Sequence, residues 1–312
     1  MRFALLLGIG YSASRLLGYS ATAPFDSTLH GQPAAQPSGD SARARALFEQ
    51  GRAFFQARRF DDAATAFERA VELHPGRSEY HLWLGNAYTK QLATANFIRK
   101  GIIGRRIGPQ YDKAVELDST SVVAADTRVD FYLEAPGMAG GGVDKAKTEA
   151  ARLTRLNAYV GGFAKARIAE KEKMSDQAEG EYRDLMRSFP DSARPVVALA
   201  TLLQNRERFA EAFAVIDARL ARFPNDTVMI YQLGRAAAIS GAELTRGEAA
   251  LHKFLALLGV SDPQSRANAH YRLGMIREKQ GDVATARAQY DSAIVLNPRY
   301  DEAIAARKRL GR

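Results

Sequence analysis

The sequence contains no cysteine among its 312 residues. This absence excludes disulfide bonds, thiolate metal ligands, a thiol nucleophile and a lipidated N-terminal cysteine. Runs of β-branched residues are also scarce, whereas alanine, leucine and arginine are common, and this balance favours helices over strands. The net charge is +9, with 44 lysines and arginines against 35 acidic residues. Such a charge permits acidic partners but identifies none.

The chain also lacks an apolar run long enough to span a bilayer, which needs about 20 residues. A shorter run, Phe3 to Gly10, follows Arg2 and leads to the small residues Ala21-Thr22-Ala23. This order is typical of a secretory signal, so residues 1–23 are predicted to be a signal peptide. Ser12-Ala13-Ser14 is a second candidate cleavage region, and a mis-assigned start codon or a disordered tail is the alternative.

Residues 24–41 combine proline and glycine with small polar residues, and they are predicted to form a flexible linker. With a functional signal, the mature protein would be periplasmic or secreted and would not span a membrane. Without one, it would be cytoplasmic.

Motifs for catalysis are missing. The five histidines show no His-Glu-x-x-His spacing, and no Gly-x-Ser-x-Gly elbow is present. The glycine-rich stretch 137–142 lacks the Lys-Ser/Thr that completes a phosphate-binding loop. We therefore expect a protein that is not an enzyme and that uses no cofactor or metal.

One pattern recurs along the chain from residue 42. Four prolines each end an apolar helical pattern, an alanine lies twelve residues before each, and a large apolar residue lies eight before. A small residue lies twenty-four before each proline. Small residues allow close helix crossings, large ones fill the gap to the next unit, and proline ends the helix. The packing signature comprises Gly51, Ala63, Phe67, Pro75, Gly85, Tyr88, Ala178, Tyr182, Pro190, Ala212, Pro224, Gly234, Gly274, Ala286, Tyr290 and Pro298.

This pattern resembles the tetratricopeptide repeat, and the long second repeat with its following glycine-rich loop is similar to exported bacterial proteins of that family. The resemblance covers roughly 42–310 and implies an all-α solenoid, a right-handed superhelix of about seven helix-turn-helix repeats. The repeats occupy 42–299, with starts near 44, 78, 122, 159, 193, 227 and 267 and with insertions near 91–109, 134–143 and 241–247. Residues 300–312 are predicted to form a capping helix.

The resemblance implies a concave groove lined by the first helix of each repeat. Positions 5 and 9 of those helices combine aromatic residues with arginine, types that are enriched at binding hot spots. The predicted groove residues are Phe48, Arg52, Leu82, Asn86, Lys90, Phe163, Arg167, Tyr231, Arg235 and Tyr271. They could hold a peptide with acidic side chains. Asp126 and Asp130 place acid where a chaperone-type carboxylate clamp would need basic residues.

A second candidate surface is a basic patch, Arg99, Lys100, Arg105 and Arg106, in a stretch from Thr89 to Tyr111 without any acid. It could meet anionic lipid, nucleic acid or an acidic protein. The simpler interpretation is the solvated face of a lengthened helix pair.

Together these observations predict a non-catalytic scaffold or adaptor in the cell envelope that binds a protein or peptide of acidic character. Two alternatives remain. One is a cytoplasmic helical-repeat protein that binds RNA, which the acidic mid-groove residues disfavour. The other is an accessory subunit of an envelope enzyme complex.

Overall fold

The computed structural model describes residues 39–259 and 262–311, and the predicted all-α solenoid is confirmed there. The chain divides into two compact units, residues 1–156 and 157–312. The expected signal peptide, 1–23, and most of the expected linker lie outside the described residues. The first helix begins at Gly39, three residues inside the segment predicted as linker.

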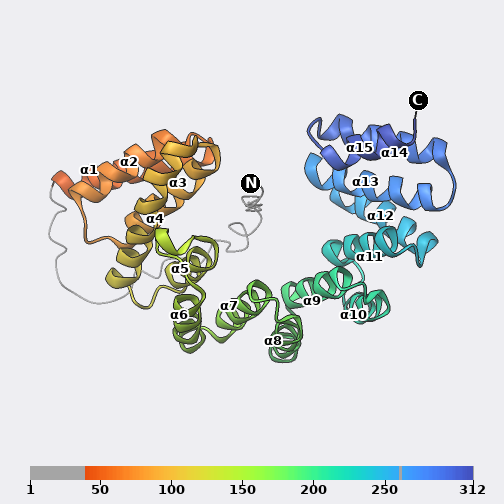
Figure 1. Cartoon of the computed structure of the whole chain (residues 1–312), viewed down its shortest axis with the longest axis horizontal. Coiled ribbons are helices and arrows are strands. Elements are labelled where there is room, and N and C mark those ends of the chain that lie inside the picture. The colour runs from red at the N-terminus through yellow and green to blue at the C-terminus, as the bar shows by residue number, and fades with distance from the viewer. Residues whose placement is uncertain (1–38, 260–261, 312) are drawn as a thin grey trace, which may run out of the picture. The chain divides into compact units, whose positions relative to one another are not determined.

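The first unit is built from three helical hairpins (Figure 1). Its helices are α1 (Gly39–Gln56), α2 (Phe60–Leu73), α3 (Ser78–Thr94), α4 (Phe97–Leu117), α5 (Val122–Glu134) and α6 (Val143–Leu156). A short 3₁₀ turn, η2 (Gly137–Ala139), precedes α6. Each helix packs mainly on the helices before and after it in the chain.

The second unit repeats this plan four times and ends in a single helix (Figure 1). Its helices are α7 (Ala158–Lys171), α8 (Ser175–Ser188), α9 (Ala193–Asn205), α10 (Phe209–Arg222), α11 (Thr227–Ser240), α12 (Leu244–Leu258), α13 (Pro263–Lys279), α14 (Val283–Leu296) and α15 (Asp301–Arg309). α15 covers α14 with its buried Ala303 and Ala306.

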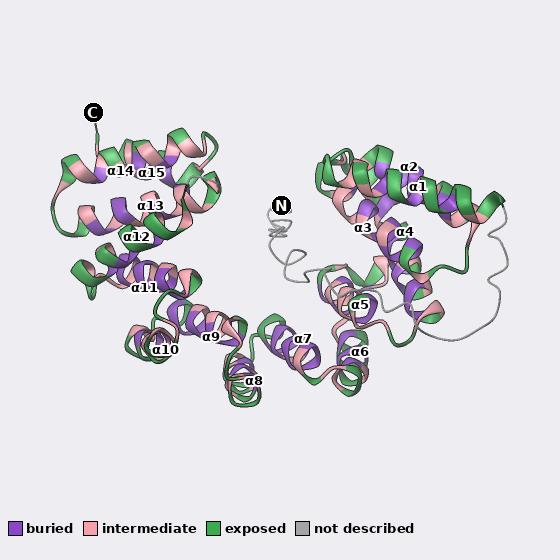
Figure 2. Ribbon diagram, turned by 180° about the vertical axis from the view of Figure 1, so that it is seen from behind, coloured by how far each residue is buried: buried purple, intermediate pink, exposed green. Residues whose placement is uncertain are grey.

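The glycines of the packing signature lie where the two helices of a hairpin cross. Gly51 lies against the ring of Phe67, and Gly274 lies against the ring of Tyr290 in the same way. Ala63, Ala178, Ala212 and Ala286 are fully buried. As a result the buried faces of neighbouring helices meet within each unit (Figure 2).

The signature prolines follow the ends of second helices at constant spacing. α2, α8, α10 and α14 each end two residues before such a proline. The capping residue between helix and proline donates its backbone N–H back into the last turn, as His74 does to the carbonyl of Ala70. Because a proline ring cannot continue the helix, the chain turns here toward the next repeat.

Two insertions are absorbed in different ways. Residues 91–109 lengthen α3 and α4 instead of forming a loop, so that α4 reaches 21 residues. Residues 135–142 form a turn around η2, in which Gly140 has a φ of +96°. A Cβ at Gly141 would lie 1.8 Å from the carbonyl oxygen of Ala135, so only glycine fits there.

The third insertion lies elsewhere than predicted. The turn between α11 and α12 has three residues, 241–243, the same number as the turn between α9 and α10. Gly247 lies inside α12, where it packs on Ala237. Most of the extra length is the first turn of α13, which starts at Pro263, four residues before the repeat start at Ala267.

Candidate functional site

Four of the predicted groove residues belong to the protein core. Phe48 is 3% exposed and its ring stacks on Tyr80 at 4.7 Å. Phe163 is equally buried, with its ring 5.1 Å from that of Tyr159. Leu82 and Arg167 are each 8% exposed. The prediction that these side chains line an open groove is therefore wrong, because rings and stems from the neighbouring helices cover them.

The remaining groove residues are half-buried, and those of the first unit are engaged in packing. Arg52 pairs with Glu49 at 3.3 Å and lies over the indole of Trp83. Asn86 Oδ1 accepts a hydrogen bond from the Tyr111 hydroxyl at 3.0 Å. Burial, together with the nearby charge of Arg58, lowers the pKa of Lys90. These contacts hold the first-unit side chains in the structure of the repeats themselves.

In the second unit the predicted residues Tyr231, Arg235 and Tyr271 come together, and two more residues join them. Arg272 follows Tyr271 on α13, and its guanidinium lies over that ring at 5.1 Å. The ring of Tyr300, just before α15, lies 5.1 Å from that of Tyr271. We call these five residues the arginine–tyrosine cluster. Tyr231 is anchored on Phe254 of α12, with ring centroids 5.2 Å apart.

Glutamine side chains position Arg235 within this cluster. The Arg235 guanidinium donates to Gln204 Oε1 on α9, and Gln204 Nε2 donates to Gln232 Oε1 at 3.2 Å. Both glutamines are buried. A neutral amide network therefore orients Arg235 without cancelling its charge.

The two arginines of the cluster lie close enough for their charges to interact. Burial, and then the nearby charge of Arg272, lower the pKa of Arg235. Within residues 39–259 and 262–311, neither guanidinium forms an ion pair with a carboxylate. The Nε–H of Arg272 is buried there without an acceptor. A bound carboxylate would offset the repulsion between the two guanidiniums and would accept a hydrogen bond from the Nε–H of Arg272.

Tyr300 adds a hydroxyl donor beside these charges. Burial raises the pKa of Tyr300 to about 12 against the lowering effect of Arg272, so the phenol stays protonated at neutral pH. The cluster thus offers two guanidiniums and a set of partly exposed phenol rings on neighbouring helices. This is a surface that can bind a carboxylate next to an apolar group.

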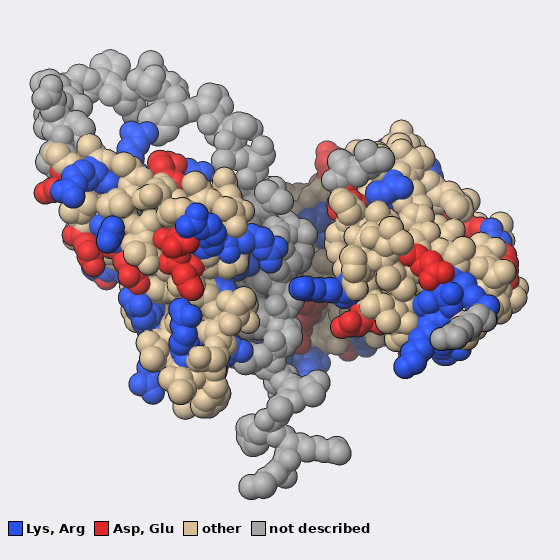
Figure 3. All heavy atoms as spheres, turned by 90° about the horizontal axis from the view of Figure 1, so that it is seen from above, with Lys and Arg blue, Asp and Glu red and all other residues tan. Residues whose placement is uncertain are grey.

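The predicted basic patch is only partly engaged. Arg99 pairs with Asp61 at 3.3 Å, and Arg106 pairs with Glu68 at 2.8 Å while lying over the ring of Tyr88. Lys100 and Arg105 make no ion pair within the described part of the chain. Elsewhere cations and acids are interspersed on the face seen in Figure 3, which fits the many ion pairs between neighbouring helices.

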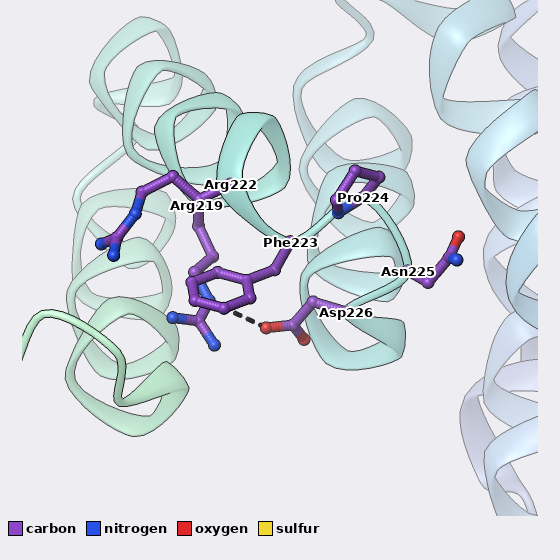
Figure 4. A pocket seen from close by; sticks show the side chains of 6 residues that line it. All are labelled: Arg219, Arg222, Phe223, Pro224, Asn225 and Asp226. Carbon is purple, nitrogen blue, oxygen red and sulfur yellow. Dashed lines mark hydrogen bonds and ion pairs between the residues drawn. The ribbon is translucent and has the colours of Figure 1, made fainter.

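A shallow surface hollow of about 420 Å³ lies at the turn between α10 and α11 (Figure 4). Its charges are already paired: Arg219 Nε lies 3.0 Å from Asp226 Oδ2, and Arg222 pairs with Asp191 at 2.7 Å. The Arg219 guanidinium also stacks on Phe223 at 3.7 Å. This arrangement joins consecutive repeats and leaves no cation for a ligand.

Histidines and acids do not gather into a metal site in the described residues. His81 makes hydrogen bonds to Gln110 and to the carbonyl of Pro75, each at 2.8 Å. His270 contacts Gln289 at 2.8 Å. These hydrogen bonds hold both rings within the packing of the repeats.

Comparison with known proteins identifies the repeat. The family model described as tetratricopeptide repeat matches residues 48–96 and 231–301. These two segments carry tetratricopeptide repeats. The second matched segment contains Tyr231, Arg235, Tyr271, Arg272 and Tyr300, so the arginine–tyrosine cluster lies within these repeats. Tetratricopeptide repeats generally form a non-catalytic scaffold for protein–protein interaction.

Solved structures show the same fold. A tetratricopeptide repeat protein from Parabacteroides merdae is 16% identical, and the match covers 87% of this chain and all of that one with a TM-score of 0.58. Yeast Tom70 is 18% identical with a TM-score of 0.64, over 87% of this chain but 53% of Tom70. None of the curated proteins compared matches the sequence.

Two cluster residues, Arg272 and Tyr300, were not predicted as groove residues. Arg272 lies at position 6 of its repeat, whereas the groove prediction rests on positions 5 and 9. Tyr300 precedes a helix interpreted as a cap alone. The run Tyr271-Arg272, repeating the pairing of an aromatic residue with arginine, is the signal that could have found the first of them.

Proposed function

We propose that this protein is a non-catalytic adaptor that binds an acidic peptide segment at the arginine–tyrosine cluster. The observation that supports the proposal is the pair Arg235 and Arg272, two half-buried guanidiniums without a carboxylate partner within the described residues. A buried donor without an acceptor costs free energy, which a bound carboxylate recovers. Phenol rings beside the charges favour a segment in which acidic and apolar residues alternate.

We further propose that the adaptor works in the cell envelope. The basic start, apolar middle and small-residue end of residues 1–23 support this location. Fractionation of cells, with protease added to intact spheroplasts, tests it. We expect the protease to cleave the protein under those conditions. If the protein is instead protected to the same extent as a cytosolic control protein, export is contradicted.

The binding experiment uses fluorescently labelled peptides in which glutamate alternates with leucine, read by anisotropy. Because each charge-assisted hydrogen bond contributes about 1.5–3 kcal/mol, Arg235→Glu with Arg272→Glu should weaken binding by at least about tenfold. The matched control is Arg45→Glu with Arg187→Glu, which changes the net charge equally at two exposed positions outside the cluster. That control should bind as the unmodified protein does.

Equal loss in both double variants would show that general charge, and not the cluster, drives binding. Unchanged affinity in the Arg235 and Arg272 variant would contradict the proposal outright. A labelled mixed-sequence RNA serves as the competing ligand. Binding of RNA that is tighter than binding of the peptide and falls steeply with salt would favour the RNA-binding alternative.

A further inference from the structure

The start of α4 is apolar on two opposite sides. Ile103 and Ile107, one helical turn apart, face the core of the first unit and are 6% and 4% exposed. Ile98 and Ile102 lie on the opposite side and are 75% and 61% exposed, and Phe97, the first residue of the helix, is 91% exposed. Three large apolar side chains are thus exposed within two turns of one helix, and a grouping of this kind typically marks an interaction site in a soluble protein.

The core does not need these three residues. It is completed along α4 by side chains at the spacing of one helical face, Ile103, Ile107, Tyr111 and Ala114. Asn96 caps the helix by accepting from the backbone N–H of Arg99 at 3.0 Å, so the first turn is formed. The exposed residues are therefore held on a folded helix and project from the repeat.

Cations border this apolar surface. Lys100 and Arg105 are on the same two turns and form no ion pair in the part of the chain that the structure describes. We call Phe97, Ile98, Lys100, Ile102 and Arg105 the α4 patch. No aspartate or glutamate occurs between Thr89 and Tyr111, so nothing within the segment offsets its charge.

The neighbouring turn between α1 and α2 carries a further cation, Arg58. Arg99 reaches Asp61 at the start of α2, which places this turn beside the start of α4. Arg58 in the turn lies close enough to Lys90 to contribute to lowering its pKa. The acids at the start of α2 are paired with other arginines, Asp61 with Arg99 and Asp62 with Arg59, so they do not pair with Lys100 or Arg105.

We propose that the α4 patch docks the first unit onto an anionic membrane surface. The first turns of α4 would enter the interface between headgroups and acyl chains, with Phe97, Ile98 and Ile102 in contact with the lipid. Lys100 and Arg105 would meet phosphate groups. Apolar insertion together with attraction to anionic lipid is the combination that gives stable interfacial binding. A nucleic acid would pair with the cations but would leave two isoleucines in water.

The test is flotation of the full chain with vesicles of phosphatidylcholine containing phosphatidylglycerol, or of phosphatidylcholine alone. We expect binding to the anionic vesicles that weakens as salt is raised, because salt screens the cations. Phe97→Ser with Ile98→Ser and Ile102→Ser should reduce the partition coefficient by about tenfold or more, since each apolar side chain contributes to transfer. Lys100→Glu with Arg105→Glu should abolish the preference for phosphatidylglycerol.

Met138→Ser with Val295→Ser is the control, because these side chains are 89% and 79% exposed but lie outside the α4 patch. It should bind like the unmodified protein, and equal loss in this control would overturn the proposal. The unmodified apolar N-terminus is present in every variant, so differences between variants report the patch alone. Fluorescence of the single tryptophan, Trp83, which packs against the core of the first unit, verifies folding in each.

A residue-specific measurement completes the test. Phe97→Trp should show fluorescence that brominated phosphatidylglycerol quenches, beyond the background of Trp83. Absence of quenching would overturn the proposal. Sedimentation without vesicles addresses the rival occupant: a dimer that the triple serine variant dissociates, combined with no vesicle binding, would replace the lipid surface with a second copy of the chain.

Discussion

The ring of Tyr111 lies directly against the backbone of Gly85, so that a Cβ built on Gly85 would come 2.6 Å from Tyr111 Cε1. The same relationship joins Gly51 to Phe67 and Gly234 to Leu251. Each pair brings the first helix of a repeat close to the second. The tyrosine in turn is buried and its hydroxyl donates to Asn86, which leaves it little freedom to move aside.

Gly85→Leu should therefore destabilise the first unit. Overpacking of a filled core typically costs about 1–3 kcal/mol, and thermal unfolding followed by circular dichroism measures it. Gly180→Leu is the matched control, because Gly180 is exposed on α8 and a Cβ there would meet nothing within 4 Å. The control should be neutral or slightly stabilising through helix propensity. An unchanged melting temperature in Gly85→Leu would contradict the helix register described above.

Acid should weaken the first unit through Glu149. This carboxylate is 4% exposed and pairs with Arg128 and Arg152, each at 2.5 Å. Burial alone would raise the pKa of Glu149, but hydrogen bonds from both arginines outweigh it and hold the pKa below its usual value of 4.5. The resulting stability is present above pH 4.5 and is lost as the pH falls through the lowered pKa.

Glu149→Gln tests this contribution. Removal of one partner from a buried ion pair leaves the other uncompensated, so we expect a loss of about 2–4 kcal/mol at neutral pH. The difference from the unmodified protein should shrink as the pH is lowered below 4.5, because protonated glutamic acid resembles glutamine. Urea unfolding at a series of pH values measures it. A difference that is constant with pH would show that packing, and not charge, is responsible.

Asp226 serves two functions that a pair of variants can separate. One oxygen caps α11 by accepting from the backbone N–H of Met229 at 3.1 Å, and the other pairs with Arg219 at 3.0 Å. Asp226→Asn keeps the cap but removes the charge, so it should cost about 1–3 kcal/mol. Asp226→Ala should cost about 1 kcal/mol more, since the cap is also lost. Chemical unfolding measures both, and equal values for the two variants would exclude a capping contribution.

The repeat architecture could be predicted from sequence because its determinants are local. Small residues at helix crossings and prolines after second helices recur at fixed spacing, and each acts within its own hairpin. Insertions were harder to place. The extra residues of the sixth repeat were assigned to its glycines, 241–247, whereas most of them extend the start of α13. A helix with an added turn has no loop composition that would reveal it.

The candidate site was only partly predictable for a related reason. Position 5 of a repeat can face outward or inward, depending on what the next repeat places beside it. Phe48 is covered because Tyr80 and Trp83 of the following repeat pack against its ring. Tyr231 stays half-exposed and contributes to the cluster. Such differences arise between repeats, so the residue type at one position does not determine them.

The exposure of the apolar residues in the α4 patch also depends on which side chains fill the adjacent core. The sequence alone allows Phe97, Ile98 and Ile102 either to close the core of the lengthened helix pair or to face solvent. The structure decides, because Ile103, Ile107 and Tyr111 already occupy the inward side of α4. The other three side chains are left exposed.

Packing between consecutive helices also has a consequence for synthesis. Because each helix packs mainly on the helices next to it in the chain, no segment must wait for a distant part of the chain to complete its contacts. A hairpin can therefore fold soon after its second helix leaves the ribosome, and each later hairpin adds to an existing surface. Such growth by addition keeps the apolar area exposed at any moment close to that of a single hairpin.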